Sequence, residues 1–208
     1  YWREIEEAHK RTPLQQSKMA GQFAYLDGFI HAAGGDIVLA SLRIAMNSYI
    51  NSAPAARDLA NKYFKMGEFM REIAKYTASS EFYTQGISLQ ETLVSEIKDR
   101  SAALQAVNSD GQSIIEELAL SYDGMAFLYK TISRYSDAAA YSVRAIDVLD
   151  TLPITKSVAY SFISALCNYS QILGKQVKLE ECEAVARRAV SVAKANLPPY
   201  DPEVARAV

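Results

Sequence analysis

Apolar residues recur every three or four positions along almost the whole chain, which is the spacing of one face of an α-helix. Strict alternation over more than four residues, the pattern of a half-buried strand, is hard to find. We therefore predict an all-α chain. The expected helices cover about 2–11, 13–33, 37–52, 54–66, 68–84, 89–107, 112–132, 136–150, 154–173 and 179–196, and another begins at 202.

Glycines and prolines set the expected helix ends. Gly67 is expected to end one helix in the left-handed conformation, which glycine adopts without steric cost. Gly86 is expected to separate two further helices, and Gly174 to begin a loop. Pro153 opens the helix that follows it, since proline suits the first helical turn.

Two stretches share a spacing that suggests a repeated helical hairpin. One reads Leu59-Ala60-x-x-Tyr63-x-x-x-Gly67-x-Phe69, and the other Met125-Ala126-x-x-Tyr129-x-x-x-Ser133-x-Tyr135. Small residues such as Ala60 and Ala126 let two helices approach closely, while the aromatic residues fill the wedge between hairpins. A single hairpin cannot bury its apolar face, so such units must stack on one another.

This spacing resembles the tetratricopeptide repeat (TPR), an antiparallel helix pair of about 34 residues. The C-terminal part, with Tyr129 to Ala138, Arg144-Ala145-Ile146 and Ala186 to Val190, resembles the longer repeats of kinesin light chains. The resemblance implies a right-handed α-α superhelix, or solenoid, of TPR-like hairpins over 1–208. Approximate repeats cover 20–53, 54–86, 118–152 and 153–197, an irregular segment covers 87–117, and another repeat starts at 199–208.

The segment 87–117 raises a question of parity. Two repeats stacked in the same sense need an even number of helices between them, and the single helix expected at 89–107 makes the number odd. Either the segment contains a kinked hairpin, or the array is interrupted there. The chain begins without Met and continues to Val208 without a terminating signal, so we expect it to be a fragment of a longer protein.

Charge and apolar content narrow the expected partners. The net charge is −2, with 12 basic and 12 acidic residues in 1–104 and 10 and 12 in the rest. A protein that grips phosphates usually has a basic excess, so we expect no nucleic-acid partner. No stretch reaches the ~18 uninterrupted apolar residues of a membrane span, and we expect no membrane insertion.

Cys167 and Cys182 are expected to be buried thiols in a reducing compartment.

No constellation of residues predicts catalysis, a cofactor or a metal. Glu6-x-x-His9 has a spacing used in di-iron bundles, but such a site needs a second copy, and the chain has 2 His. His31 falls at a helix position that aromatic residues usually fill in these repeats, so we expect a packed side chain there. We therefore predict no catalytic residue, no metal site and no cofactor.

A group of basic residues near the C-terminus allows two interpretations. Its members are Lys175, Lys178, Arg187, Arg188 and Lys194. Glu180, Glu181 and Glu183 are interleaved with them, which favours a mixed, solvated helix face. The other interpretation is a docking patch for an acidic peptide.

The resemblance implies protein–protein binding, in which the first helix of each hairpin lines a concave groove that takes a peptide or a partner subunit. One alternative is a structural subunit buried in a larger assembly. A less favoured alternative is an RNA-binding array of helical hairpins, against which the net charge argues. We expect an intracellular, cytoplasmic location, and the sequence leaves the oligomeric state open.

The groove residues are predicted from the repeat alignment. Asp123, Phe127, Lys130 and Thr131 are spaced by three and four and so share one helix face. Aligning Tyr63 with Tyr129 puts Arg57, Asn61 and Phe64 at the matching positions of the earlier repeat. Phe127 and Lys130 are the expected anchors, because aromatic residues and long cations are common hot spots.

Overall fold

The computed structural model describes residues 39, 42–45, 47, 55–104 and 109–207, with side chains left out for 100–104. The helices expected at 2–11 and 13–33, most of the one at 37–52, and the residues Glu6, His9 and His31 lie outside this part of the chain. Cys167 is buried as expected, Cys182 is half-buried, and both are free thiols.

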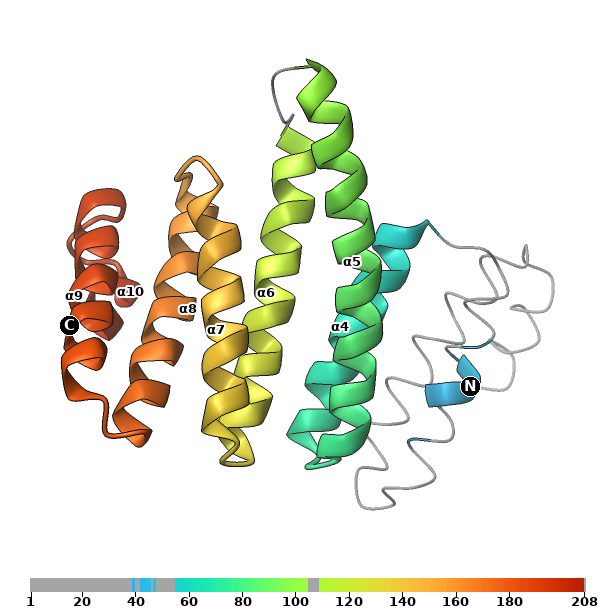
Figure 1. Ribbon diagram of the computed structural model, residues 1–208, viewed down its shortest axis with the longest axis horizontal. Helices are drawn as coiled ribbons and strands as arrows, with labels where there is room; N and C mark the ends of the chain where they lie inside the picture. Colours follow the sequence, from blue (N-terminus) through green and yellow to red (C-terminus); the bar gives the residue numbers. More distant parts are fainter. Residues whose placement is uncertain (1–38, 40–41, 46, 48–54, 105–108, 208) are drawn as a thin grey trace. The chain divides into compact units, whose positions relative to one another are not determined.

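The described residues from 55 onward form helices joined by short turns, with no strand among them (Figure 1). This confirms the all-α prediction. The helices are α4 (Ala56–Glu72), α5 (Tyr76–Leu104), α6 (Ser109–Thr131), α7 (Tyr135–Asp150), α8 (Lys156–Lys175), α9 (Leu179–Asn196) and α10 (Pro202–Ala207).

The chain divides into two compact units, Tyr1–Phe82 and Tyr83–Val208. In the first unit, Gly67 lies buried inside α4, so the prediction that it ends a helix is wrong. Its carbonyl oxygen accepts a hydrogen bond of 2.7 Å from Ser79 Oγ on α5. Glycine costs about 1 kcal/mol relative to alanine inside a helix, and the absence of a side chain at Gly67 is compatible with this close approach of two helices.

Helix α5 is continuous from Tyr76 to Leu104 and carries Gly86, buried, in its interior. The separate helices expected at 68–84 and 89–107 are therefore wrong. The parity question disappears with them, because α5 and α6 together account for the segment 87–117 without an extra helix. In the second unit, α5 and α6 reach beyond the turn that joins α7 to α8 (Figure 1).

Three turns close the hairpins α4/α5, α6/α7 and α8/α9, and they have the same geometry. Each has a non-glycine residue with positive φ at its centre: Ala74 at 59°, Ser133 at 61° and Val177 at 62°. The next residue's N–H reaches back five positions, as in Lys178 N–H to Leu173 O at 3.0 Å, a Schellman-type bond. Gly174 lies within α8, so it does not begin the loop.

In the second unit the helices pack in sequence, α6 on α7, α7 on α8 and α8 on α9. The first helices of successive hairpins also touch, because α6 contacts α8 and α8 contacts α10. Alanines occupy these contacts, and Ala126, Ala138, Ala145, Ala159 and Ala189 are fully buried. The short α10 lies in the range 199–208, where the start of a further repeat stays a prediction.

Candidate functional site

One stripe of α6 faces away from the core of the second unit. Leu120 and Phe127 lie seven residues apart along it, and the side chain of Leu120 is 38% exposed. Phe127 is half-buried, and the ammonium of Lys130 lies 4.3 Å from the centre of its ring. The stripe therefore offers two apolar side chains with a cation beside the second.

Beside this stripe, α6 and α8 are joined by a ladder of polar contacts that we call the α6–α8 polar seam. Glu116 Oε1 accepts hydrogen bonds from Ser157 Oγ at 2.7 Å and Ser161 Oγ at 2.8 Å. Asp123 accepts from Ser164 Oγ at 3.2 Å and from Asn168 Nδ2 at 2.9 and 3.0 Å. Lys130 Nζ donates to Asn168 Oδ1 at 3.0 Å and Gln171 Oε1 at 2.9 Å.

Helical periodicity explains why the seam forms. Glu116, Asp123 and Lys130 are spaced by seven residues, nearly two turns, so they occupy one edge of α6. On α8 the partner side chains follow spacings of four and three, which keep them on one face. The seam thus fixes two first helices to each other along most of their length.

Asp123 is the most enclosed charge of the seam. Burial raises its pKa, while hydrogen bonds from Asn168 and Ser164 and the charges of Lys130 and Arg206 act in the opposite direction. A carboxylate removed from water needs such donors to remain ionised. Asp123 therefore belongs to the joint between the helices, and it is not a side chain of the open surface.

The other residues predicted on α6 lie nearer the surface. Lys130 is half-buried and Thr131 is exposed, with its hydroxyl donating to the Phe127 carbonyl oxygen at 2.9 Å. The structure thus brings together all four predicted residues of α6, with two of them engaged in the seam. Whether they bind a partner stays a prediction.

Arg57, Asn61 and Phe64 lie on α4 in the first unit, each half-exposed. The hairpin turns now give the register of the repeats, because Ala74 and Ser133 occupy the same turn position, 59 residues apart. The alignment of Tyr63 with Tyr129 used a shift of 66 residues, so it was displaced by seven. The true counterparts of these three residues on α6 are Glu116, Leu120 and Asp123.

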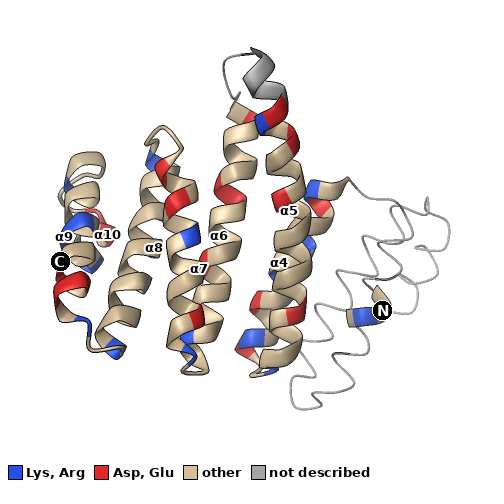
Figure 2. Ribbon diagram, in the orientation of Figure 1, with Lys and Arg blue, Asp and Glu red and all other residues tan. Residues whose placement is uncertain are grey.

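Helix α8 carries charge only at its ends, at Lys156 and Lys175 (Figure 2). Near the first end, Tyr160 donates to Asp201 Oδ2 at 2.6 Å, which helps to hold the loop before α10. This hydrogen bond lowers the pKa of Asp201, and the charge of Lys156 acts in the same direction. Sequence reasoning missed Leu120, Ser164, Asn168 and Gln171. A signal was present only for Leu120, which lies three residues before Asp123 and seven before Phe127.

A second cluster lies where α5, α6 and α7 meet in the second unit. Glu91 Oε1 accepts from Tyr122 Oη and from Arg144 Nη2, each at 2.5 Å. The Arg144 guanidinium carbon lies 4.3 Å from the centre of the Tyr122 ring. The ring centres of Tyr129 and Tyr141 lie 5.6 Å apart, with the rings tilted by 30°. Burial raises the pKa of Tyr122. Each charged group here already has an opposite charge or a ring beside it, so the cluster is a structural brace.

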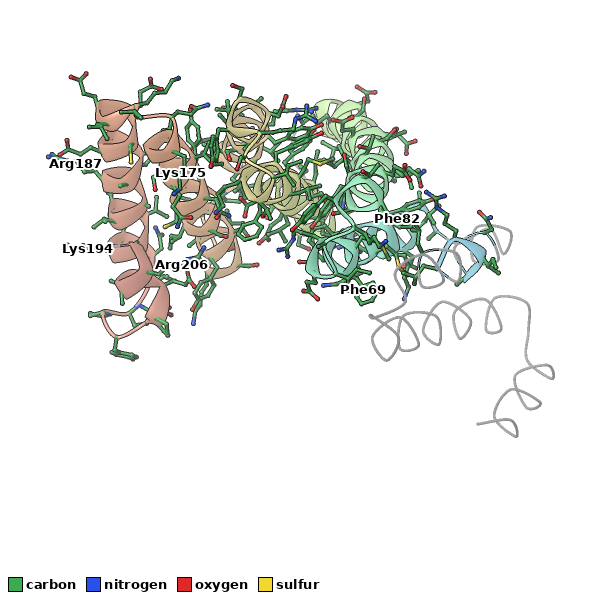
Figure 3. All side chains as sticks on the ribbon, turned by 90° about the horizontal axis from the view of Figure 1, so that it is seen from below. Phe69, Phe82, Lys175, Arg187, Lys194 and Arg206 are labelled. Carbon is green, nitrogen blue, oxygen red and sulfur yellow. The ribbon has the colours of Figure 1, made fainter. Side chains whose placement is uncertain are left out.

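The basic residues near the C-terminus are mostly paired with carboxylates. Lys178 pairs with Glu181 at 3.5 Å, Arg187 with Glu183 at 2.5 Å, and Arg188 with Asp150. Figure 3 shows Arg187 and Lys194 on the side of α9 that faces away from α8. This arrangement supports the mixed, solvated face over a docking patch.

Two kinds of site are not found among the described residues. No group of three or more His, Cys, Asp or Glu side chains in this part of the chain is placed to hold a metal ion. None of the helices described has a stretch long and apolar enough to cross a bilayer.

Comparison with known proteins supports the fold. No family model matches the chain, and no curated protein matches it in sequence. Among solved structures, it is similar to BtubC (BKLC) from P. vanneervenii, with a TM-score of 0.64 and 13% identity over 89% of this chain and 66% of that one. It is also similar to aspartyl phosphate phosphatase F from Bacillus subtilis, with a TM-score of 0.64 and 12% identity over 92% and 44%.

The chain therefore spans less than two thirds of either protein. Both are helical repeat structures of the TPR-like type. Because the identity is so low, the similarity shows the fold alone, and this fold is TPR-like.

Proposed function

We propose that this chain is a non-catalytic binding protein. The face formed by the first helices of its second unit, α6, α8 and α10, takes a protein or peptide partner. This is the face that lines the groove of TPR-like arrays, so the assignment rests partly on fold analogy.

The observation that supports the proposal is the stripe on α6. Leu120 and Phe127 hold apolar surface at the solvent boundary, and Lys130 lies over the Phe127 ring. Aromatic residues, Phe among them, are enriched in protein interfaces, and the Lys130 cation adds a charge beside this ring. The α6–α8 polar seam holds these side chains on rigid helices, which lowers the entropy lost on binding.

Affinity purification from the source organism tests this proposal. The tagged chain serves as bait in parallel with Phe127→Ala, Lys130→Ala and, as a control on α7, Val143→Ala. We expect a protein that co-purifies with the parent and the control and binds each groove variant at least tenfold more weakly, about 1.4 kcal/mol. Circular dichroism checks that the variants fold, because Lys130 also supports the seam.

The structural-subunit alternative predicts a different result. There the partner covers much of the solenoid, so both groove variants retain full binding. An RNA-binding array is the less favoured alternative, and a salt titration of nucleic-acid binding tests it, because phosphate contacts weaken steeply with salt.

Two finer assignments are also proposals. We propose that the C-terminal repeats are of the kinesin-light-chain type, supported by the 44 residues between the equivalent turn positions Ser133 and Val177. That separation is near the period of about 42 residues expected for such repeats. We also propose a cytoplasmic location, with which the free thiols of Cys167 and Cys182 are compatible.

A further inference from the structure

We infer that the partner element on this face is an amphipathic α-helix that runs antiparallel to α6, with an acidic N-terminal turn and a basic C-terminal turn. The inference rests on the proposed function and specifies the chemistry of its partner. Three observations carry it: the spacing of the apolar side chains, the state of the polar groups beside them, and the charges at the two ends of the face.

The spacing of Leu120 and Phe127 fits a helix. Seven residues of α6 span about 10.5 Å, and a partner helix repeats its own apolar face at the same interval. An extended strand repeats side chains on one face every ~6.8 Å. One such repeat is shorter than the ~10.5 Å spacing of Leu120 and Phe127, and two repeats are longer. A polyproline helix repeats about every 9.3 Å, which is nearer but does not match.

The polar groups beside this stripe are already engaged. The Asn168 amide nitrogen donates to both oxygens of Asp123, and its oxygen accepts from Lys130. An extended peptide needs hydrogen-bond partners for its backbone N–H and C=O groups. The Asn168 side chain is a poor partner for them, because its hydrogen bonds to Asp123 and Lys130 are already made. A helix satisfies its own backbone and needs only apolar contact and charge complementarity.

The ends of the face differ in charge. Lys175 lies one turn beyond Gln171 at the C-terminal ends of α6 and α8, exposed and without an ion pair among the described residues. At the other end, the Glu116 carboxylate accepts hydrogen bonds from two serine hydroxyls and has no ion pair with any residue that the structure describes. The charge of Lys156, at the same end of α8, acts on Asp201.

These charges orient the partner helix. An acidic turn fits the Lys175 end and a basic turn fits the Glu116 end. Because acidic residues stabilise the N-terminus of a helix and basic residues its C-terminus, the partner helix begins near Lys175. It therefore runs antiparallel to α6.

A designed peptide tests the inference directly. The probe is a fluorescent, alanine-based helix of about 18 residues, with leucines seven positions apart, Glu in its first turn and Arg in its last. Fluorescence anisotropy measures its binding to the full chain. We expect saturable binding that weakens at least tenfold in Leu120→Asp, but not in Val143→Asp. Val143 is the matched control, since it is also 38% exposed and lies on α7.

A matched pair of charge-reversal variants tests the orientation of the partner helix. Lys175→Glu should weaken the probe at least threefold, whereas Lys194→Glu, an exposed change on α9 (Figure 3), should not. A second probe with the charges of its two ends exchanged should prefer Lys175→Glu over the parent chain. Equal effects at Lys175 and Lys194 would overturn the antiparallel orientation.

A proline-rich peptide with the same leucine spacing separates this inference from the proposed function. If that peptide binds and the helical probe does not, the helix inference fails while binding at this face stands. If neither peptide binds, the helix inference fails, and the purification with Phe127→Ala and Lys130→Ala then decides the proposed function independently.

Discussion

Val177 lies at a position where a β-branched residue is poorly accommodated. It is the central residue of the α8/α9 turn, with φ of 62°, and its side chain is 75% exposed. The left-handed conformation brings Cβ close to the following carbonyl oxygen, a clash that glycine avoids. Replacing Val177 with glycine should therefore stabilise the fold.

The size of the effect follows from two opposing terms. The left-handed conformation costs an L-residue roughly 1–2 kcal/mol, which the glycine variant recovers. Glycine loses about 0.5–1 kcal/mol more backbone entropy on folding. Because the valine side chain is mostly in solvent, little packing is lost, and the net gain should be about 0.5–1 kcal/mol, or roughly 1–4 °C in Tm for a chain of this size.

Urea and thermal unfolding, followed by circular dichroism, measure this change. Val143→Gly is the control, since Val143 is an exposed valine with ordinary helical geometry in α7. It should lower stability by a few tenths of a kcal/mol. A lowered midpoint for Val177→Gly, similar to that of the control, would refute the turn geometry.

Three further predictions concern the second unit. Gly124→Ala should lower the urea midpoint despite the better helix propensity of alanine, because the new Cβ would lie 2.9 Å from Cε1 of the buried Tyr83. Gly174→Ala is the matched change, since its Cβ meets no other side chain nearer than 3.8 Å. It should raise the free energy of unfolding by about 0.5–1 kcal/mol. Ala126→Leu should cost about 1–3 kcal/mol by overpacking a fully buried contact, and an unchanged midpoint would contradict that packing. Burial raises the pKa of Asp123, so its contribution to stability is largest at acid pH and falls as pH rises through the folded-state pKa. Asp123→Asn should therefore flatten the dependence of the unfolding free energy on pH in that range. An unaltered slope would contradict this.

Periodicity alone located several helices well. The expected helix 179–196 coincides with α9, Leu179–Asn196, and the expected helix 136–150 begins one residue after α7, Tyr135–Asp150. Both are amphipathic and end at clear signals, Pro198-Pro199 for the first and Thr151 to Pro153 for the second. Where the apolar stripe and the breaking residues agree, the helix bounds follow from sequence.

Gly67, Gly86 and Gly174 misled because they lie inside helices and not at turns. Gly67 lies where Ser79 reaches its carbonyl oxygen. The turns themselves have Ala74, Ser133 and Val177 at positive φ, where no glycine or asparagine signals a left-handed conformation. Stacking of the hairpins holds these strained residues in place, and that tertiary cause cannot be read from local sequence.

The alignment of Gly67 with the turn residue Ser133 also gave the repeats a wrong register, but it left the predicted residues on one helix face. The alignment of Tyr63 with Tyr129 was displaced by seven residues, and seven residues make nearly two turns of an α-helix. Arg57, Asn61 and Phe64 therefore fall on the face of α4 that corresponds to the stripe of α6, although two turns from the assumed counterparts. A heptad displacement preserves which face is exposed and loses which residues are neighbours. The sequence therefore grouped these residues on one helix face, and partner binding at that face stays a prediction. The seam that joins Asp123 and Lys130 to α8 required the packed structure.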